Sequence, residues 1–325
     1  MNSGMASTEV RRATSTPVVT VVIPVFNRAN SVLPTLESVS NQTFTDWECV
    51  IVDDGSEDGE ALRTVLRELD DPRFLYARQA NGGGGSARNL GIDRAHGRYI
   101  AFLDSDDRFM PNKLERMLSN ADSTARLVWY SPVLLDRGED RYWTRPARSI
   151  RRGEPAAEYL FVANQLIQTS TLLMPTWLAK EVRFDPSLRK GQDLDFVVRL
   201  EALGGASFEM ISEPLTVWTD VTEANRTSRT PGHEAPQRWL EGARQLMSER
   251  AYHGYRATVL AYYMAQKRPV LALWHLLDGG VRARVRPTIL ARQIVRAYVP
   301  RKWYRRLVDT AVAFLGRPRD AHGSQ

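Results

Sequence analysis

The sequence predicts an α/β fold with a mostly parallel sheet. Through the N-terminal third of the chain, short runs of β-branched and other apolar residues alternate with segments of helical length, and each apolar run ends in a polar or glycine-rich cluster. Strands that alternate with helices form parallel sheets, and ligands bind beyond the carboxyl ends of those strands. We therefore expect a ligand site where the polar clusters meet.

The first strands and helices can be placed in order. A β-branched run over residues 18–23 stops at Pro24, and Val32, Leu36 and Val39 then recur at helical spacing. Further strands are expected over residues 49–52, 74–76 and up to Asp104, with helices through Leu62, Val65 and Leu66 and over residues 87–95.

The alternation weakens after Arg126. We expect strands over residues 127–130, 166–174, 208–211 and 215–218, a helix over 193–203, and a mostly helical remainder divided at Pro269, Pro287 and Pro300. The predicted domains are a disordered N-terminus (1–17), a large domain (18–235) that ends in a loop or linker at 219–236, and a helical basic region (236–325).

Composition indicates a globular protein. The chain has 325 residues, of which 43% are hydrophobic and 25% charged. Its single cysteine, Cys49, excludes a disulfide framework and a cysteine-rich zinc site, and favours a reducing compartment. No apolar run approaches the roughly 20 residues that span a bilayer. We therefore expect a cytoplasmic protein.

An aspartate cluster follows the strand that begins near Tyr99. Asp104, Asp106 and Asp107 lie within four residues, and such carboxylates repel one another unless a cation lies among them. Oxygen ligands at this spacing suit Mg²⁺ or Mn²⁺ carrying a diphosphate. The alternative is a solvated turn that caps a helix beginning near Pro111.

Five segments together resemble the successive motifs of the family-2 inverting glycosyltransferases. They are residues 20–28, 52–56, 84–91, 101–107 and 191–196. Each motif is weak alone, but their order and spacing over residues 18–220 are specific. The resemblance implies a GT-A fold, transfer of a hexosyl group from a nucleotide-diphospho-sugar with inversion, and a Mn²⁺ or Mg²⁺ cofactor. It also assigns residues 18–107 to nucleotide binding and residues 108–235 to the acceptor.

The resemblance implies roles for residues at the ends of the first two strands. The nucleoside is expected to lie on Pro24, Val25, Phe26 and Asn27, although these residues could also form a plain strand-to-helix turn. Asp53 is expected to accept the imide N–H of a uracil or thymine ring, which favours a UDP- or dTDP-sugar. We expect Asp54 to brace the turn with Gly55 and Ser56.

Phosphate and metal roles fall on the next two motifs. The glycine-rich run at residues 81–86 lacks the Gly-Lys-Ser/Thr of a nucleotide-binding P-loop, so we expect a flexible loop. Arg88 is expected to bind a phosphate or hold the aspartates, or else to be an ordinary exposed helix residue. Asp104 is assigned to the ribose or the metal's water shell, Ser105 to the nucleotide, and Asp106 to the metal.

The acidic motif is expected to supply the catalytic base. The family usually has Glu-Asp here, whereas this chain has Gln192 and Asp193. Asp193 is the predicted base, Asp195 is the alternative, and Gln192 is a candidate acceptor contact. The segment 217–221 lacks the histidine that many relatives have, so Trp218 is expected to stack on a sugar or simply to pack.

The charge is concentrated near the C-terminus, where residues 279–308 contain nine Arg or Lys and no acid. Apolar residues at helical spacing, among them Leu290, Ile294 and Tyr298, predict basic amphipathic helices within 282–325. These could lie on the anionic inner face of the cell membrane, which makes peripheral association an expectation, or pack on the catalytic domain. We find no motif for nucleic-acid binding.

The sequence does not specify the acceptor, for which a cell-envelope glycan, a lipid-linked intermediate and a small natural product are all open. A nucleotidyltransferase is an alternative, but it would have a glycine-rich signature with a basic residue after the first strand, where this chain has Pro-Val-Phe-Asn. A non-catalytic nucleotide- or glycan-binding protein on the same fold is a second alternative.

Overall fold

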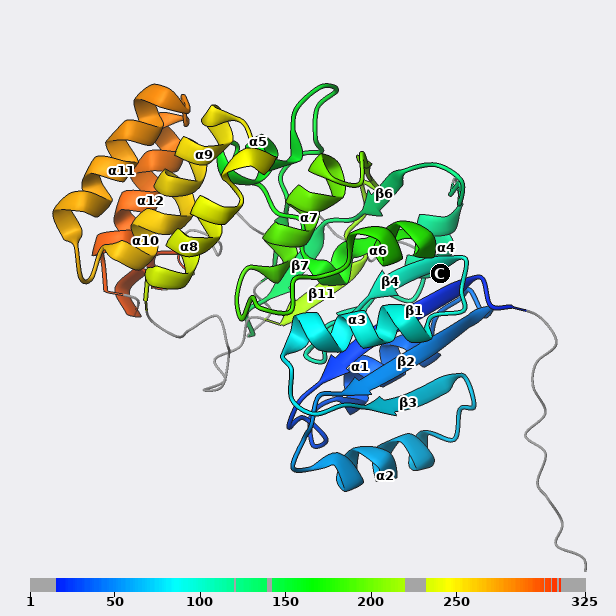
Figure 1. Cartoon of the computed structure of the whole chain (residues 1–325). Coiled ribbons are helices and arrows are strands. Elements are labelled where there is room, and N and C mark those ends of the chain that lie inside the picture. Colours follow the sequence, from blue (N-terminus) through cyan, green and yellow to red (C-terminus); the bar gives the residue numbers. More distant parts are fainter. Residues whose placement is uncertain are drawn as a thin grey trace, which may run out of the picture.

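The computed structural model describes residues 16–119, 121–138, 142–219, 232–300, 302–304, 306–308 and 310. Its central sheet has seven strands in the order β10-β6-β9-β4-β1-β2-β3 and helices on both faces (Figure 1). These strands are β1 (Val19–Val25), β2 (Trp47–Asp53), β3 (Phe74–Arg78), β4 (Tyr99–Phe102), β6 (Leu127–Tyr130), β9 (Leu172–Pro175) and β10 (Ser207–Met210). All neighbours are parallel except β9, which is antiparallel to β4 and β6. The predicted α/β class is confirmed.

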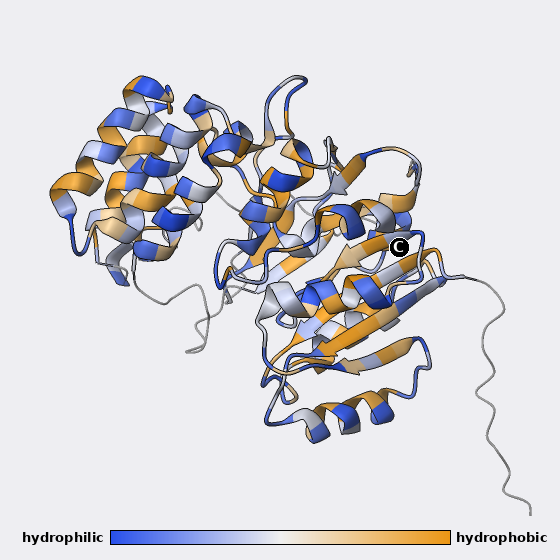
Figure 2. Cartoon of the chain, in the orientation of Figure 1, coloured by the Kyte–Doolittle hydropathy of each residue, from blue (hydrophilic) through white to orange (hydrophobic). Residues whose placement is uncertain are grey.

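Three helices connect the first four strands as expected. They are α1 (Leu33–Ser40), α2 (Gly59–Leu69) and α3 (Gly84–Arg94). Successive residues of β1 bury opposite faces: Val22 packs in the core that contains α3, whereas Val21 and Ile23 pack with α1. Both faces of β1 are therefore buried, which explains its continuous apolar run, and Figure 2 shows the same hydrophobic character in the neighbouring strands.

A second sheet has four short strands in the order β5-β11-β7-β8. They are β5 (Asp107–Phe109), β7 (Val133–Asp136), β8 (Tyr142–Arg145) and β11 (Thr216–Thr219). Strand β11 runs antiparallel to β5 and places Trp218 opposite Asp107. This pairing brings an aromatic side chain from late in the chain to the aspartate cluster.

Two local expectations were wrong. Residues 166–174 do not form one strand, because polar residues 168–171 include a 3₁₀ turn, η1 (Thr169–Thr171), and β9 begins only at Leu172. The alternative in which the aspartate cluster caps a helix near Pro111 is also wrong, because Asp107 starts β5 and Asn112 precedes α4 (Lys113–Leu118).

The acceptor half contributes three further helices, and the C-terminal region is helical as predicted. The bounds are α5 (Ala156–Phe161), α6 (Thr176–Val182), α7 (Gln192–Ala202), α8 (Glu234–Gly242), η3 (Arg244–Leu246), α9 (Glu249–Tyr255), η4 (Arg256–Leu260), α10 (Ala261–Met264), α11 (Pro269–Arg282) and α12 (Pro287–Tyr298). Pro269 and Pro287 begin α11 and α12, and Pro300 follows the end of α12.

One continuous core joins the sheet to the helical region. It extends from Val22 and Phe102 through Phe161 of α5 to Leu276 of α11. The domain boundaries remain predictions. Residues 1–15 of the expected N-terminal tail, residues 220–231 of the expected linker and residues 311–325 of the basic tail lie outside the described residues.

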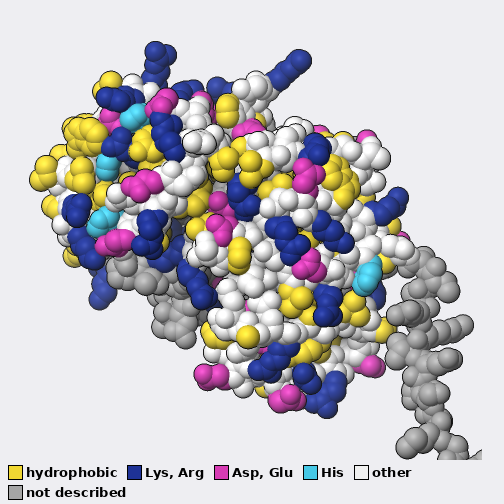
Figure 3. Space-filling model, in the orientation of Figure 1, with side chains coloured by type: hydrophobic (Ala, Val, Ile, Leu, Met, Phe, Trp, Pro, Cys, Tyr) yellow, Lys and Arg dark blue, Asp and Glu magenta, His cyan; other side chains and the backbone are white. Residues whose placement is uncertain are grey.

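Helix α11 exposes an apolar stripe. Val270, Trp274, Leu277 and Val281 are 82%, 48%, 59% and 79% exposed, and hydrophobic side chains gather over this helix at the left edge of Figure 3. None of the helices in the described residues is long and apolar enough to cross a membrane.

Candidate active site

A cleft of about 520 Å³ opens at the carboxyl ends of β1 and β4, beside the first turns of α3 and α7. Ten of the twelve residues predicted for the site lie on its wall: Pro24, Val25, Phe26, Arg88, Asp104, Ser105, Asp106, Gln192, Asp193 and Trp218. Asn27 and Asp53 are not among the residues that line it. The fold therefore brings together motifs more than 150 residues apart.

The apolar floor of the cleft follows β1. Phe26 is 47% exposed, so its ring offers a face to a planar ligand. Asn27 adopts a left-handed conformation, with φ of 52°. Its side-chain oxygen accepts the backbone N–H of Glu57 at 2.8 Å, and its own backbone N–H donates to Ser56 Oγ at 3.0 Å. Asn27 thus ties the ends of β1 and β2 together.

Asp53 is fully buried behind the cleft. Its carboxylate accepts hydrogen bonds from the Ser56 backbone N–H at 2.8 Å and the Tyr76 hydroxyl at 2.6 Å, and it lies 3.6 Å from Arg78. Burial works to raise the pKa of Asp53, but the hydrogen bonds and the charge of Arg78 outweigh it and lower the pKa. The predicted contact with a nucleobase would have to share an oxygen that already accepts.

Asp54 holds the glycine-rich loop. Its carboxylate accepts the backbone N–H groups of Gly82 and Gly83, both at 2.8 Å, and the side-chain amide of Gln79 at 2.7 Å. The expectation that Asp54 braces the turn with Ser56 is wrong, because Asp53 accepts the Ser56 N–H. The glycine loop is fixed at its start by a side chain on the cleft wall.

Arg88 connects two of the predicted motifs. Its guanidinium donates to the Asp104 carboxylate and, at 2.7 Å, to the Gln192 side-chain oxygen. The Gln192 amide nitrogen in turn donates to the Leu188 carbonyl at 2.6 Å. Arg88 is only 7% exposed, so it is not an ordinary surface residue of α3.

The three aspartates are separated by the fold. Asp104 and Asp106 line the cleft, and Asp106 lies 3.4 Å from Arg28. Asp107 is fully buried and accepts hydrogen bonds from Gln168 at 2.9 Å and Ser170 at 2.7 Å. Burial, with the charges of Asp104 and Asp106, raises the pKa of Asp107 well above its ordinary value.

Asp193 lies in the first turn of α7, which begins after Gly191 in a left-handed conformation. Burial and the charge of Asp104 raise the pKa of the Asp193 carboxyl, while the Leu194 backbone N–H and the charge of Arg88 oppose the shift. A raised pKa suits a carboxylate that accepts a proton.

Asp195, the alternative base, has a different environment. Its carboxylate contacts Arg199 at 2.8 Å and the Trp239 indole N–H at 2.9 Å, and it is not among the residues that line the cleft. It joins α7 to α8.

The sequence interpretation missed several residues of the cleft wall. Arg28, Arg189 and Lys190 add positive charge, and Asn81, Gln168 and Thr169 add polar groups. The Arg189 guanidinium lies over Gly83, where an added Cβ would be 2.7 Å from it. The basic pair directly before the acidic motif was a signal that could have identified Arg189 and Lys190.

The metal-binding capacity of the cleft rests on few protein ligands. Within the part of the chain that the structure describes, no group of three or more His, Cys, Asp or Glu side chains could hold a metal. Two carboxylates, Asp104 beside Arg88 and Asp106 beside Arg28, line the cleft at the strand end. Mg²⁺ is commonly held by one or two carboxylates with water and substrate phosphates, so this donor set fits a metal that arrives with a diphosphate.

Comparison with known proteins agrees with this geometry. Residues 20–174 match the family model described as glycosyl transferase family 2. The chain is 32% identical over 247 residues to the amylovoran biosynthesis glycosyltransferase AmsB of Erwinia amylovora, across 73% of this chain and 81% of that protein. It is 35% identical over 201 residues to an uncharacterized glycosyltransferase of Rickettsia bellii, across 59% of this chain and 28% of that protein.

The fold is also that of a solved structure. The crystal structure of S. aureus TarS 1-349 in complex with UDP-GlcNAc has a TM-score of 0.58, covers 93% of both chains and is 18% identical. The fold and the cleft define a glycosyltransferase of the GT-A class. The family model and the relatives identify the family: the chain belongs to glycosyl transferase family 2.

Proposed function

We propose that this protein is a metal-dependent, inverting glycosyltransferase that moves a sugar from a UDP- or dTDP-sugar to a hydroxyl of a cell-envelope polysaccharide or its lipid-linked precursor. The observation that carries the proposal is that one cleft holds the Asp104 and Asp106 carboxylates and a separate carboxyl group, Asp193, with a raised pKa. The name of AmsB supports a polysaccharide product, and the UDP-GlcNAc complex of TarS supports a UDP-sugar.

Donor binding would use both the apolar floor and the basic wall. The exposed ring of Phe26 offers a surface for the base, and Arg28, Arg189 and Lys190 offer cations to the diphosphate. Arginine in particular matches phosphate oxygens with two parallel hydrogen bonds.

Asp106 would hold Mn²⁺ or Mg²⁺, with Asp104 beside it. When bound, such a cation neutralises the charge that develops on a departing diphosphate. Arg88 orients Asp104 through its hydrogen bond, so this carboxylate is held in place before a ligand arrives.

Asp193 would accept the proton of the acceptor hydroxyl as that oxygen attacks the anomeric carbon from the face opposite the diphosphate. Direct attack of this kind inverts the anomeric configuration. Trp218 lies on the wall of the same cleft and offers an aromatic face to a sugar.

The metal assignment can be tested by binding. A ligand that binds only the native state raises the melting temperature, so UDP with Mn²⁺ should stabilise the wild type more than UDP alone. Asp106→Ala should abolish the Mn²⁺-dependent part of this shift, whereas the exposed control Asp122→Ala should retain it. An unchanged Mn²⁺ dependence in Asp106→Ala would show that the metal assignment is wrong.

We also propose that the helical region lies on an anionic membrane surface. The apolar stripe of α11 continues onto α12 at Tyr298, whose hydroxyl donates to the Pro269 carbonyl at 2.6 Å. The alternative, in which the basic helices pack on the rest of the protein, holds in part, because Leu290 and Gln293 of α12 pack inward. The residues that remain exposed would insert beside the basic side chains of α11 and α12.

A further inference from the structure

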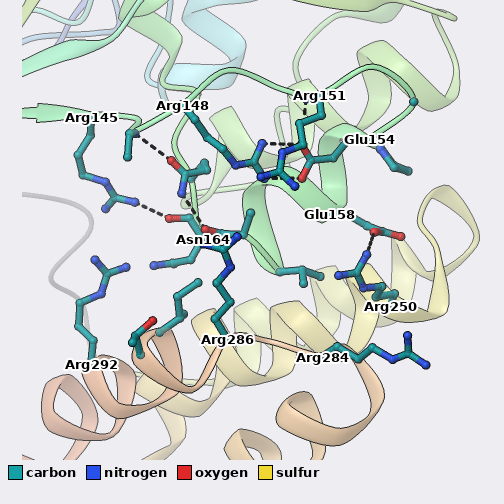
Figure 4. Close-up of a pocket in the computed structure, with 18 of the residues that line it drawn as sticks. Arg145, Arg148, Arg151, Glu154, Glu158, Asn164, Arg250, Arg284, Arg286 and Arg292 are labelled. Atoms are coloured by element: carbon teal, nitrogen blue, oxygen red, sulfur yellow. Dashed lines mark hydrogen bonds and ion pairs between the residues drawn. The ribbon is translucent and has the colours of Figure 1, made fainter.

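A second cavity, of about 710 Å³, lies between the segment that follows β8 and the C-terminal helices. Eight of its lining residues are arginines. Figure 4 shows Arg145, Arg148 and Arg151 on one side and Arg284, Arg286 and Arg292 on the other, with Arg250 at one end. We call this cavity the arginine pocket.

The pocket contains far more positive than negative charge. Its carboxylates are Glu154 and Glu158. Glu154 accepts two hydrogen bonds of 2.6 Å from Arg148, and Glu158 accepts one of 2.7 Å from Arg250. Both acids are therefore already paired.

The other arginines lack such partners. Among the residues that the structure describes, no carboxylate forms an ion pair with Arg145, Arg284, Arg286 or Arg292. Arg145 donates to the Asn164 carbonyl at 2.6 Å. Burial, with the nearby charges of Arg292 and Arg296, lowers the pKa of Arg145 to about 10. Like charges held this close repel one another until an anion lies between them.

The backbone adds to the positive electrostatic potential of the pocket. Helix α12 is 12 residues long and begins at the pocket, where its N-cap residue Arg286 and the first-turn residues Thr288 and Ile289 form part of the wall. This turn contains no acidic residue and no side-chain cap. The positive end of the helix dipole therefore faces the pocket without a neutralising group.

The pocket and the donor cleft are adjacent. Asn164 and Gln165 line the pocket, and the next residue, Leu166, lines the cleft. Consecutive Cα atoms are about 3.8 Å apart, so the segment 164–166 borders both cavities.

We propose that the arginine pocket binds a phosphate or diphosphate group of the acceptor while the acceptor's hydroxyl reaches the donor cleft. Arginine forks match phosphate oxygens, and the volume exceeds what a single phosphate fills. The inference rests on the proposed function in one respect, since an acceptor has meaning only for a transferase.

The test measures binding of inorganic pyrophosphate to the full-length protein by calorimetry. Arg286→Ala/Arg292→Ala should weaken binding by about tenfold or more, because charge-assisted hydrogen bonds are lost. The control Arg94→Ala/Arg98→Ala removes the same charge from exposed positions outside both cavities and should bind like the wild type. Equal affinities for the two double variants would overturn the proposal.

The donor cleft also contains cations, so the titration is repeated with Arg189→Ala/Lys190→Ala. Binding that survives this change but is lost in Arg286→Ala/Arg292→Ala belongs to the arginine pocket; if all pyrophosphate binding is lost with Arg189 and Lys190, the proposal fails. Should the alanine double variant unfold, the single exposed change Arg286→Glu gives the same comparison.

A second arm distinguishes the source of the phosphate. A prenyl diphosphate in nonionic detergent that binds more tightly than pyrophosphate, with the same dependence on Arg286 and Arg292, would identify a lipid-linked acceptor; equal affinities would identify recognition of the phosphate alone. UDP-sugar hydrolysis reports on the proposed function separately. Hydrolysis that persists in the pocket variant, with pyrophosphate binding lost, supports both proposals. Absent hydrolysis in the wild type contradicts the proposed function and, with it, the acceptor role of the pocket, while the pyrophosphate titration still decides whether the pocket binds phosphate.

Discussion

Arg88 gives a physical reason for the neutral residue at Gln192. The guanidinium is shared between Asp104 and the Gln192 side-chain oxygen, so an amide fulfils the acceptor role that a carboxylate would have in the usual Glu-Asp motif. A neutral group here also avoids a further negative charge beside Asp193. Gln192 therefore gives Arg88 a hydrogen-bond acceptor without adding a charge.

The catalytic prediction concerns Asp193. Asp193→Asn keeps the size of the side chain but removes the proton acceptor, so turnover should fall by about 10² to 10⁴, or roughly 3 to 5 kcal/mol of transition-state stabilisation. UDP affinity should hold. Asp195→Asn is the control: it should weaken the contacts with Arg199 and Trp239 and lower stability while leaving turnover closer to normal. The reverse pattern would move the base to Asp195.

The raised pKa of Asp193 predicts the pH dependence of turnover. The base acts only when deprotonated, so kcat should fall as the pH falls through its pKa. Because burial raises that pKa, the acidic limb should lie above the ordinary aspartate value of about 3.9. A pH profile of kcat for the wild type should show this limb, and the residual activity of Asp193→Asn should lack it.

At the scale of elements, sequence patterns predicted β11 and a strand near each of the seven strands of the central sheet, and missed β5, β7 and β8 of the second sheet. Strands β1 and β2 have seven residues each and apolar runs buried on both faces. Strand β5 has three residues, and β8 is largely half-exposed. Strands β5 and β7 pair with β11, far along the chain, and among the described strands β8 pairs only with β7; a local pattern does not contain the distant pairing on which this sheet depends.

The same limit applies to the site. The residues of the cleft wall could be predicted because polar clusters at the ends of parallel strands must meet. The different roles of Asp53 and Asp54 could not be predicted. Asp53 accepts a hydrogen bond from Tyr76 on β3, and Asp54 accepts one from the backbone N–H of Gly82, and both partners lie outside the local motif. Similarly, the arginine pocket combines residues 143–165 with residues 250–292, which no motif connects.

The contact of α3 with β1 gives a stability prediction. A Cβ added at Gly91 would lie 2.2 Å from Val22 Cγ1, so Gly91→Ala should force the helix away from the sheet. Overpacking of this kind costs about 1 to 3 kcal/mol. The control Gly242→Ala has no atom within 4 Å of the added Cβ and should leave the free energy of unfolding nearly unchanged. Urea unfolding of both variants measures the difference; similar values would contradict the packing argument.

At the scale of the whole molecule, the helical region shares its core with the catalytic sheet and presents α11 outward (Figures 1 and 3). Helix α5, from the acceptor half, packs on both α7 and α9. The helix that carries Asp193 is therefore connected to α11, which is proposed to meet the membrane, through the packing of α5 and α9.

The membrane proposal predicts sedimentation with anionic liposomes. Val270→Glu/Leu277→Glu places two charges in the exposed stripe of α11 and should reduce co-sedimentation. Leu75→Glu/Leu203→Glu, at residues 40% and 60% exposed elsewhere, is the matched control and should bind like the wild type. High salt should weaken binding because charges are screened beyond about 8 Å at physiological ionic strength. Equal sedimentation of the two double variants would exclude the stripe as the membrane contact.

The burial of Asp107 affects how the cleft would balance the charge of a bound donor. With that carboxylate sealed in the interior by Gln168 and Ser170, Asp104 and Asp106 are the members of the cluster that line the cleft, and each already lies beside an arginine, Arg88 and Arg28. A divalent cation bound there would add its charge to a wall to which Arg189 and Lys190 also contribute positive charge. Salt screens such charges, so raising the ionic strength should weaken donor affinity even when the metal is saturating.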